Sequence, residues 1–91
     1  MSHNLRPHPD VVARQLGDAI VLVQLTSSEI YELNRTGSLL WSGIAAGKSI
    51  DAIRAEILAS YDVDEAMLDG EIAPLIRQLL DAELLLDDDQ L

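Results

Sequence analysis

Cysteine and phenylalanine are absent from this chain of 91 residues, and the only other aromatic residues are one tryptophan and two tyrosines. The lack of cysteine excludes disulfide bonds, thiolate zinc sites and thiol catalysis. Three aromatic side chains are also too few to line a groove that stacks nucleic-acid bases. The core must therefore be built from leucine, isoleucine, valine and alanine, within a hydrophobic content of 48%.

Long hydrophobic runs are missing as well. The longest, AIVLVQL, is too short to span a bilayer, and the N-terminus lacks a signal-peptide pattern. We therefore expect a cytoplasmic protein that makes no membrane contact. A chain of this length forms one small domain, which buries about two thirds of its unfolded surface.

Basic residues are few, with six Lys and Arg against 16 Asp and Glu, and the formal net charge is −10. Residues 1–45 carry four acids and three arginines, a balance of −1, whereas residues 46–91 carry 12 acids and three bases, a balance of −9. Nucleic-acid binding depends on Lys and Arg that neutralise phosphates, so this charge opposes it. The acids are expected to solvate the second half of the chain, and the alternative is a preference for basic partners.

Catalytic side-chain combinations are missing too. His3 and His8 are the only histidines, and both lie in a proline-containing N-terminal segment without matching metal ligands. The remainder of the chain has no histidine to activate a serine or threonine, and it has no glycine-rich phosphate loop. Carboxylate pairs occur in loops and at the C-terminus, where a solvated surface is the expected role. The sequence predicts a protein that is not an enzyme and needs no cofactor or metal.

The chain does contain a strand pattern followed by a helix pattern. Residues 1–10 contain two prolines and are expected to form a flexible arm. After it, VVARQL, AIVLVQL and EIYELN have the composition of strands, and the turns Gly17-Asp18 and TSS join them. Short turns between consecutive strands predict a three-stranded antiparallel sheet, in which each outer strand keeps one free edge unless something protects it.

The period changes from strand to helix at Leu33-Asn34. Tyr31 and Leu33 lie two residues apart and are expected to point into the core, while Asn34 is suited to cap a helix. The apolar residues that follow recur at intervals of three and four, which is helical spacing. Gly47 is expected to end this first helix, and Ser49 to cap a second.

A third helix is expected from about Glu65 to Ala82. Gly70 and Pro74 weaken its middle, so the helix either bends there or begins only near Glu71. Its apolar residues cover an arc of roughly 140°, whereas a helix on one core needs a stripe of about 100°. They are Leu68, Ile72, Leu75, Ile76, Leu79 and Leu80, and two alanines widen the arc.

The surplus flank of that helix carries Ala73, Ile76 and Leu80, with Arg77 beside it. Either a small leucine-rich core wraps this helix more fully, or the flank faces something outside the protein. A free third-strand edge beside an apolar helix can capture an extended peptide by strand addition. This second interpretation predicts a peptide-binding site formed by Glu29, Ile30, Tyr31, Glu32, Leu33, Ala73, Ile76, Arg77 and Leu80.

The order of these marks resembles the PqqD-like family, the recognition elements of ribosomally made, post-translationally modified peptides. The resemblance covers residues 11–86, and residues 87–91 are expected to form an acidic tail. Its marks are the apolar hairpin, Tyr31-x-Leu33-Asn34, a glycine before Leu40-Trp41, and the segments GKSI, YDVD and LLDAELL. Two departures stand out, because Pro74 lies inside the third helix and Glu83 takes the place where a glycine often stands.

The resemblance implies an α+β fold, with a three-stranded antiparallel sheet followed by three helices, similar to a winged helix. It also implies a non-catalytic adaptor in which the leader segment of a precursor peptide adds to the third strand, beside the third helix. Such a protein hands the precursor to modifying enzymes. A leader peptidase and cyclase of a lasso-peptide pathway are the preferred partners, and a radical enzyme of quinone-cofactor synthesis is the alternative.

Two other classes compete with this interpretation. A winged-helix regulator would have the same order of helices, but the negative charge opposes it. An acidic carrier protein needs a serine at a helix start, and Ser49 meets that requirement. Carrier proteins, however, lack the preceding sheet.

Overall fold

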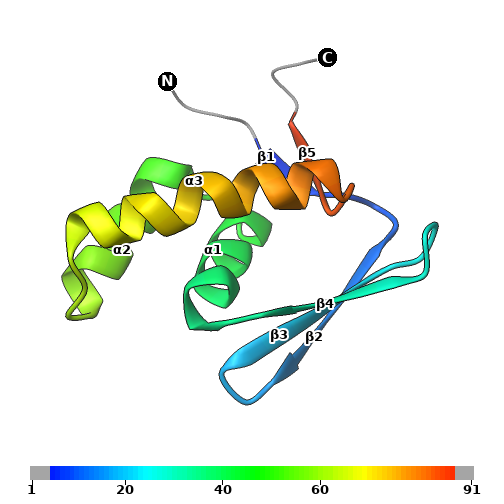
Figure 1. Cartoon of the computed structure of the whole chain (residues 1–91), viewed down its shortest axis with the longest axis horizontal. Coiled ribbons are helices and arrows are strands. Elements are labelled where there is room, and N and C mark those ends of the chain that lie inside the picture. Colours follow the sequence, from blue (N-terminus) through cyan, green and yellow to red (C-terminus); the bar gives the residue numbers. More distant parts are fainter. Residues whose placement is uncertain (1–4, 88–91) are drawn as a thin grey trace.

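The computed structural model describes residues 5–87, which form a three-stranded sheet, three helices and a small second sheet made by the two ends of this range (Figure 1). The fold is α+β, as predicted, with a three-stranded antiparallel sheet followed by three helices. The elements in chain order are β1 (Leu5–Pro7), β2 (Val11–Leu16), β3 (Ala19–Gln24), β4 (Glu29–Leu33), α1 (Arg35–Ala45), α2 (Ile50–Ser60), α3 (Glu65–Asp81) and β5 (Leu85–Asp87).

The larger sheet has the order β2-β3-β4, and both of its pairings are antiparallel. The first turn pairs Leu16 with Ala19 across Gly17. Gly17 has a φ of +63°, a left-handed conformation that glycine adopts without steric cost. The second turn pairs Gln24 with Glu29. Both turns were predicted from the sequence, and they make β2 and β4 the edge strands of this sheet.

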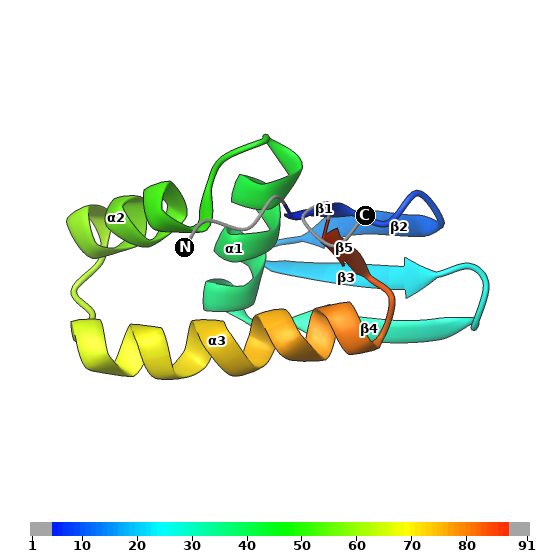
Figure 2. The ribbon, with the colours of Figure 1, turned by 90° about the horizontal axis from the view of Figure 1, so that it is seen from above.

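All three helices lie on the same side of this sheet (Figure 1), and α2 lies beyond the end of the strands (Figure 2). Side chains of β3 alternate accordingly, because Ile20, Leu22 and Gln24 face the helices and are buried, whereas Val21 and Val23 are half-buried. The core between sheet and helices consists of Ile20, Leu22, Leu33, Leu40, Trp41, Ile44, Ile53, Ile57, Leu68, Ile72, Leu79, Leu84 and Leu85. The buried cluster therefore lies on one face of the sheet, where strand and helix residues meet.

The joint between sheet and helices lies where the sequence predicts it. The Asn34 side chain caps α1, because its Oδ1 accepts a hydrogen bond from the Gly37 backbone N–H at 2.9 Å. A Cβ atom on Gly37 would lie only 3.2 Å from the Cβ of Leu33, so the start of α1 packs tightly against the end of β4. Ser49 caps α2 in the same way.

Helix α3 is continuous through Gly70 and Pro74. It begins at Glu65, where the Asp64 side chain accepts a hydrogen bond from the Met67 backbone N–H at 3.2 Å. The alternative start near Glu71 is therefore wrong. No helix within residues 5–87 has the length and apolar character needed to cross a membrane.

The second sheet corrects the expectation of a flexible N-terminal arm. Leu5–Pro7 forms β1, which pairs antiparallel with β5, so the expectation is wrong for these three residues. The His8 backbone N–H also donates to the Leu84 carbonyl at 3.0 Å. Asp87, expected in the acidic tail, belongs to β5. Residues 1–4, which include His3, and residues 88–91 lie outside the described residues.

Candidate functional site

A groove runs between the edge strand β4 and helix α3, which lie side by side in Figures 1 and 2. It consists of two adjoining hollows of about 460 and 530 Å³ that share Tyr31, Pro74 and Gln78. We call these two hollows the β4–α3 groove. A smaller hollow of about 180 Å³ continues past Thr36 and Glu71 toward Met67. The groove therefore follows most of the length of α3.

The first wall of the groove is β4, whose Tyr31 and Leu33 side chains face the helices. Leu33 is buried, and Tyr31 is half-buried and reaches both hollows. The Tyr31 hydroxyl donates a hydrogen bond to Oε2 of Glu29 at 3.0 Å. This hydrogen bond, together with burial and the negative charge of Glu29, raises the pKa of Tyr31 above its ordinary value. The hydrogen bond to Glu29 holds the Tyr31 ring at the groove wall.

The backbone of β4 is as important as its side chains. Among the described residues, β4 pairs only with β3, so its second edge carries unpaired N–H and C=O groups. In an antiparallel sheet every second residue directs both groups toward the same edge. This free edge borders the groove and offers main-chain hydrogen bonds to an extended segment.

The second wall is one face of α3, on which Gly70, Pro74 and Gln78 recur at intervals of four. Gly70 has no side chain and Pro74 has a short one, which leaves space beside β4. Pro74 has no N–H, so the Gly70 carbonyl lacks its usual helical donor. Gly70 is exposed and lines the groove, so the surface of α3 is open at this point.

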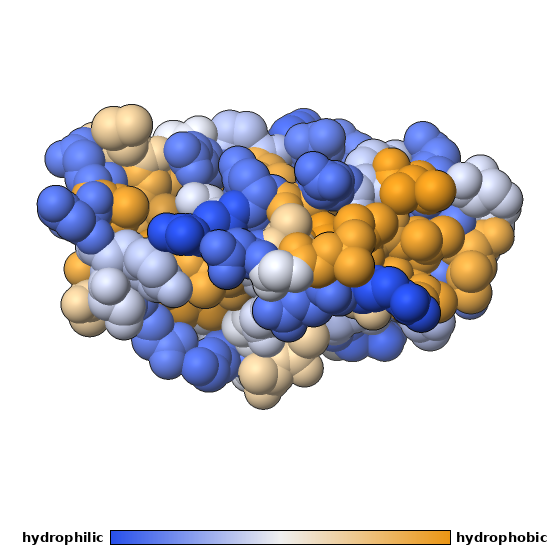
Figure 3. Space-filling view, turned by 90° about the horizontal axis from the view of Figure 1, so that it is seen from below, coloured by the Kyte–Doolittle hydropathy of each residue, from blue (hydrophilic) through white to orange (hydrophobic). Residues whose placement is uncertain are grey.

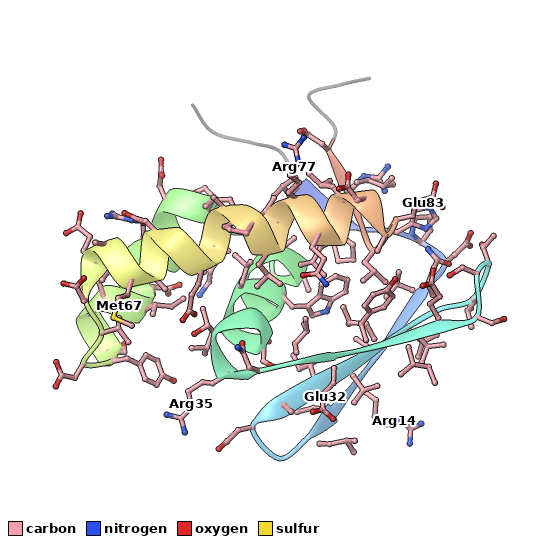
Figure 4. All side chains as sticks on the ribbon, in the orientation of Figure 1. Arg14, Glu32, Arg35, Met67, Arg77 and Glu83 are labelled. Atoms are coloured by element: carbon pink, nitrogen blue, oxygen red, sulfur yellow. The ribbon has the colours of Figure 1, made fainter. Side chains whose placement is uncertain are left out.

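Charges lie at the rim of the groove. Glu29 and Asp81 mark one end and Glu71 the other, and Arg77 is the one basic residue among those lining the two hollows. Arg77 makes no ion pair with another residue in the range 5–87. Figure 4 places its side chain on the side of α3 that faces away from β4. Arg77 also lines a separate hollow of about 560 Å³ beside β5, so it stands at the border of two depressions.

The structure separates the nine residues of the predicted site into two groups. Five of them line the β4–α3 groove: Glu29, Tyr31, Glu32, Leu33 and Arg77. Glu32 contributes through its backbone, because Figure 4 shows its side chain below the sheet, on the side away from the helices. The remaining four residues do not line the groove: Ile30, Ala73, Ile76 and Leu80.

The predicted flank of α3 therefore does not line the β4–α3 groove. Ile76 and Leu80 are half-buried and pack against the core, and Leu80 lines the hollow beside β5. The more modest interpretation, a small core that wraps the helix more fully, holds for these two residues. Ala73 is exposed, and Ile30 is 69% exposed on the sheet face away from the helices. Contact of any of the nine residues with a peptide stays a prediction.

The residues that face the groove from α3 were not predicted from the sequence. Gly70 and Pro74 were interpreted only as weak points of the helix, and Gln78 was not considered. Their regular spacing of four was the available signal, because it places two residues with short side chains on one helix face. Within residues 5–87, no group of three His, Asp or Glu side chains could hold a metal ion.

Comparisons with known proteins agree with this architecture. The family model for Coenzyme PQQ synthesis protein D (PqqD) matches residues 19–85. No curated protein matches the chain. The structure of TbiB1 in complex with the TbiA(beta) leader peptide aligns with a TM-score of 0.81 and 30% sequence identity, covering 88% of this chain and 93% of that chain.

A second structure, lasso peptide synthetase B1 complexed with the leader peptide, aligns with a TM-score of 0.80 over 91% of this chain and 98% of that chain. Its sequence identity is 24%, so this likeness shows the fold alone. The family match, by contrast, extends from β3 through the first residue of β5. The chain therefore belongs to the PqqD family.

Proposed function

We propose that this protein is a recognition element that binds the leader segment of a precursor peptide and delivers it to modifying enzymes, without catalysing a reaction itself. The observation that carries the proposal is the free edge of β4 beside an open groove. It is supported by the 30% identity to TbiB1, a protein whose structure is in complex with a leader peptide.

The geometry supports binding by strand addition. An extended leader aligned with β4 would continue the sheet through main-chain hydrogen bonds, and it would place every second side chain into the groove. Because β4 has five residues, the aligned part of the leader is about five residues long. Tyr31 and Leu33 on one wall and Leu75 on the other supply apolar contacts for the inserted side chains.

The charges at the rim indicate the composition of the leader. Acidic side chains stand at both ends of the groove, while its middle, around Pro74 and Gln78, is uncharged. We therefore expect a leader with apolar residues at alternate positions and with neutral or basic residues beside them. An acidic residue is expected only where it can approach Arg77.

Among modification pathways, a lasso-peptide pathway is the first candidate, with a leader peptidase and a cyclase as the enzymes that receive the bound precursor. TbiB1, the 30% identical relative, is bound to a leader peptide, and the 24% identical structure is named a lasso peptide synthetase. The name of the family model favours the alternative, service to a radical enzyme in quinone-cofactor synthesis. Both alternatives place the protein in the cytoplasm and require neither nucleic acid nor membrane.

A backbone-modified leader tests the mode of binding. The probe is a synthetic TbiA(beta) leader peptide, the leader bound by the 30% identical TbiB1, and a scrambled peptide is the control. Two variants of the leader are compared, one N-methylated at its odd-numbered amides and one at its even-numbered amides. Calorimetry should show that one variant no longer binds and that the other binds like the unmodified leader. Equal effects of the two modifications would contradict strand addition.

Hydrogen exchange locates the site independently. Amides of Glu29–Leu33 that face the free edge should gain protection when the leader is saturating, while amides of β2 should not. Unchanged exchange along β4 would remove this edge from the site. The non-catalytic part of the proposal is tested by mass spectrometry, because the precursor incubated with the pure protein should keep its mass.

A further inference from the structure

The sheet face that points away from the helices is apolar and is not covered by any described element. The strand registers place two cross-strand rows on it, Val12–Val23–Ile30 and Arg14–Val21–Glu32. We call these six residues the outer sheet face. Val12 is 48% and Ile30 is 69% exposed. Figure 3, which views the molecule from below, shows hydrophobic residues gathered over the sheet on this side.

Exposed apolar residues on a sheet face usually mark an interaction surface when they are contiguous. Here they form a continuous row across all three strands, and Leu16, next to the second row, adds another side chain at 57% exposure. The helices cannot cover them, since all three lie on the opposite side of the sheet (Figure 1).

The charges on this face differ from those of the rest of the molecule. The outer sheet face carries one arginine and one glutamate, a balance of zero, in a chain whose net charge is −10. Arg14 lies on one edge strand and Glu32 on the other, with Val21 between them. Two strand spacings of about 4.8 Å separate their backbones, and no ion pair joins the two side chains.

We propose that the outer sheet face binds a second copy of this chain in a two-fold symmetric dimer. A two-fold axis that runs along β3 between two facing sheets places β2 of one copy opposite β4 of the other. Arg14 of each copy then faces Glu32 of its partner, and Val12 faces Ile30. Val21 and Val23 meet their own equivalents at the axis, so the face is complementary to itself in both charge and apolar character.

This arrangement tolerates the twist of real sheets. Packed sheets cross at about 30°, which shifts each Arg14–Glu32 pair by only about 2 to 3 Å along the strands. An arginine side chain spans that shift. Facing sheets lie about 10 Å apart, a separation at which valine and isoleucine side chains from both faces interdigitate.

The size of the face sets the strength of the dimer. Three strands of five or six residues present a plane of only about 250 to 300 Å² per copy, which places the interface below the standard size of stable complexes. We therefore expect a weak dimer that dissociates on dilution. The dimer leaves both β4–α3 grooves open, because each groove lies on the helix side of its sheet.

Substitutions that reverse the charges of Arg14 and Glu32 test the proposal. The molar mass of the protein at low salt, measured by sedimentation and light scattering from about 1 to about 500 μM, should rise from monomer to dimer. Arg14→Glu and Glu32→Arg should each weaken the dimer at least about tenfold, because symmetry turns two attractive pairs into two repulsive ones. The double variant Arg14→Glu/Glu32→Arg should recover most of the affinity, since it restores both pairs in reverse.

Three outcomes would overturn the proposal. The first is a wild-type protein that stays monomeric at the highest concentration. In the second, the dimer is indifferent to both single substitutions, which would place the contact at another surface such as the β4 edge. In the third, the double variant is as weak as the single ones. All four proteins should keep the same thermal midpoint within a few degrees, because both side chains are exposed.

Discussion

The side-chain amide of Gln24, at the end of β3, donates a hydrogen bond to the backbone carbonyl of Glu83, just after α3, at 2.6 Å. The side-chain oxygen Oε1 of Gln24 accepts a second hydrogen bond, from the Thr26 backbone N–H at 2.9 Å. Gln24 is only 1% exposed, so both ends of a buried amide are paired. This side chain holds the exit of α3 against the sheet and thereby fixes one end of the β4–α3 groove.

Replacing Gln24 with leucine should destabilise the protein by about 1 to 3 kcal/mol. The substitution keeps most of the volume but leaves the Glu83 carbonyl and the Thr26 N–H, which are partly buried by these contacts, without their partner. Thermal unfolding followed by circular dichroism measures the effect, which should lower the midpoint by about 4 to 8 °C per kcal/mol. Gln15→Leu is the control, because Gln15 is exposed and should change the stability by less than about 0.5 kcal/mol.

Replacing Glu83 with glycine should stabilise the protein. Glu83 has a φ of +60°, a left-handed conformation that costs a residue with a Cβ atom about 1 to 2 kcal/mol. The greater freedom of glycine in the unfolded chain offsets part of this gain, which leaves about 0.5 to 1 kcal/mol. Glu71→Gly, inside α3, should instead cost about 1 kcal/mol, and equal effects of the two substitutions in the same direction would contradict this explanation.

Adding one methyl group should have opposite effects at two glycines. A Cβ atom on Gly43 would lie 2.4 Å from Cγ1 of Ile53, so Gly43→Ala forces α1 and α2 apart and should cost about 1 to 3 kcal/mol. A Cβ atom on Gly70 meets nothing within 4 Å, so Gly70→Ala should stabilise α3 by about 0.5 to 1 kcal/mol. Chemical denaturation of both variants gives the comparison. A neutral Gly43→Ala would show that the two helices are less closely packed than described.

Acid should remove one contact between α2 and α3. Arg54 donates hydrogen bonds to Glu65 and Asp69, and its guanidinium holds the pKa of Asp69 below the ordinary value of 3.8. Because the pKa of Asp69 is lower in the folded than in the unfolded protein, its ionised form stabilises the fold at pH values above the ordinary pKa. This stabilisation is lost as the pH falls through the pKa of the folded state. Arg54→Gln should therefore lower the thermal midpoint at neutral pH.

The same variant should match the wild type at about pH 2, where the carboxylates are protonated. Thermal scans of both proteins across this range measure the difference. A deficit that stays constant with pH would instead assign the effect to lost packing of the arginine stem. Lys48→Gln is the control, because Lys48 pairs with Glu56 alone and its loss should be smaller.

Reversing the charge of Arg77 should weaken leader binding at least several-fold. Arg77 is the one basic residue that lines the β4–α3 groove, and a glutamate in its place would join Glu29 and Asp81. Calorimetry with the leader measures the affinity. Arg14→Glu, on the other face of the sheet, should leave the affinity unchanged. Equal affinity of Arg77→Glu and wild type would show that Arg77 serves only the hollow beside β5.

Local features of this fold could be predicted because each depends on neighbouring residues. The helix cap of Asn34 follows from one side chain and the N–H three residues later. The turn at Gly17 follows from a conformation that glycine favours. The spacing of apolar residues changes from two to three and four after Leu33, and this local pattern separates the sheet from the first helix. The free edge of β4 then follows from the order of three strands joined by short turns.

Features that depend on distant contacts could not be predicted. The strands β1 and β5 have three residues each, which is too short for a periodic pattern, and they pair from opposite ends of the described chain. The rotation of α3 also escaped prediction. The apolar arc of the helix was predicted, but the flank that faces β4 is decided by contacts between distant residues. These are the packing of Leu79 and Leu84 in the core and the hydrogen bond between Gln24 and Glu83.

Pairing of β1 with β5 has a consequence for how the chain folds. It joins the segments with the greatest sequence separation in the structure, so the loop that it closes contains nearly every other element. Closing such a loop costs more chain entropy than forming the β2–β3 hairpin or one of the helices. The hairpin and helices are therefore expected to form first and β1–β5 to dock last. Once docked, the two segments open together, so fraying at Leu5 is coupled to fraying at Asp87, its partner in the register.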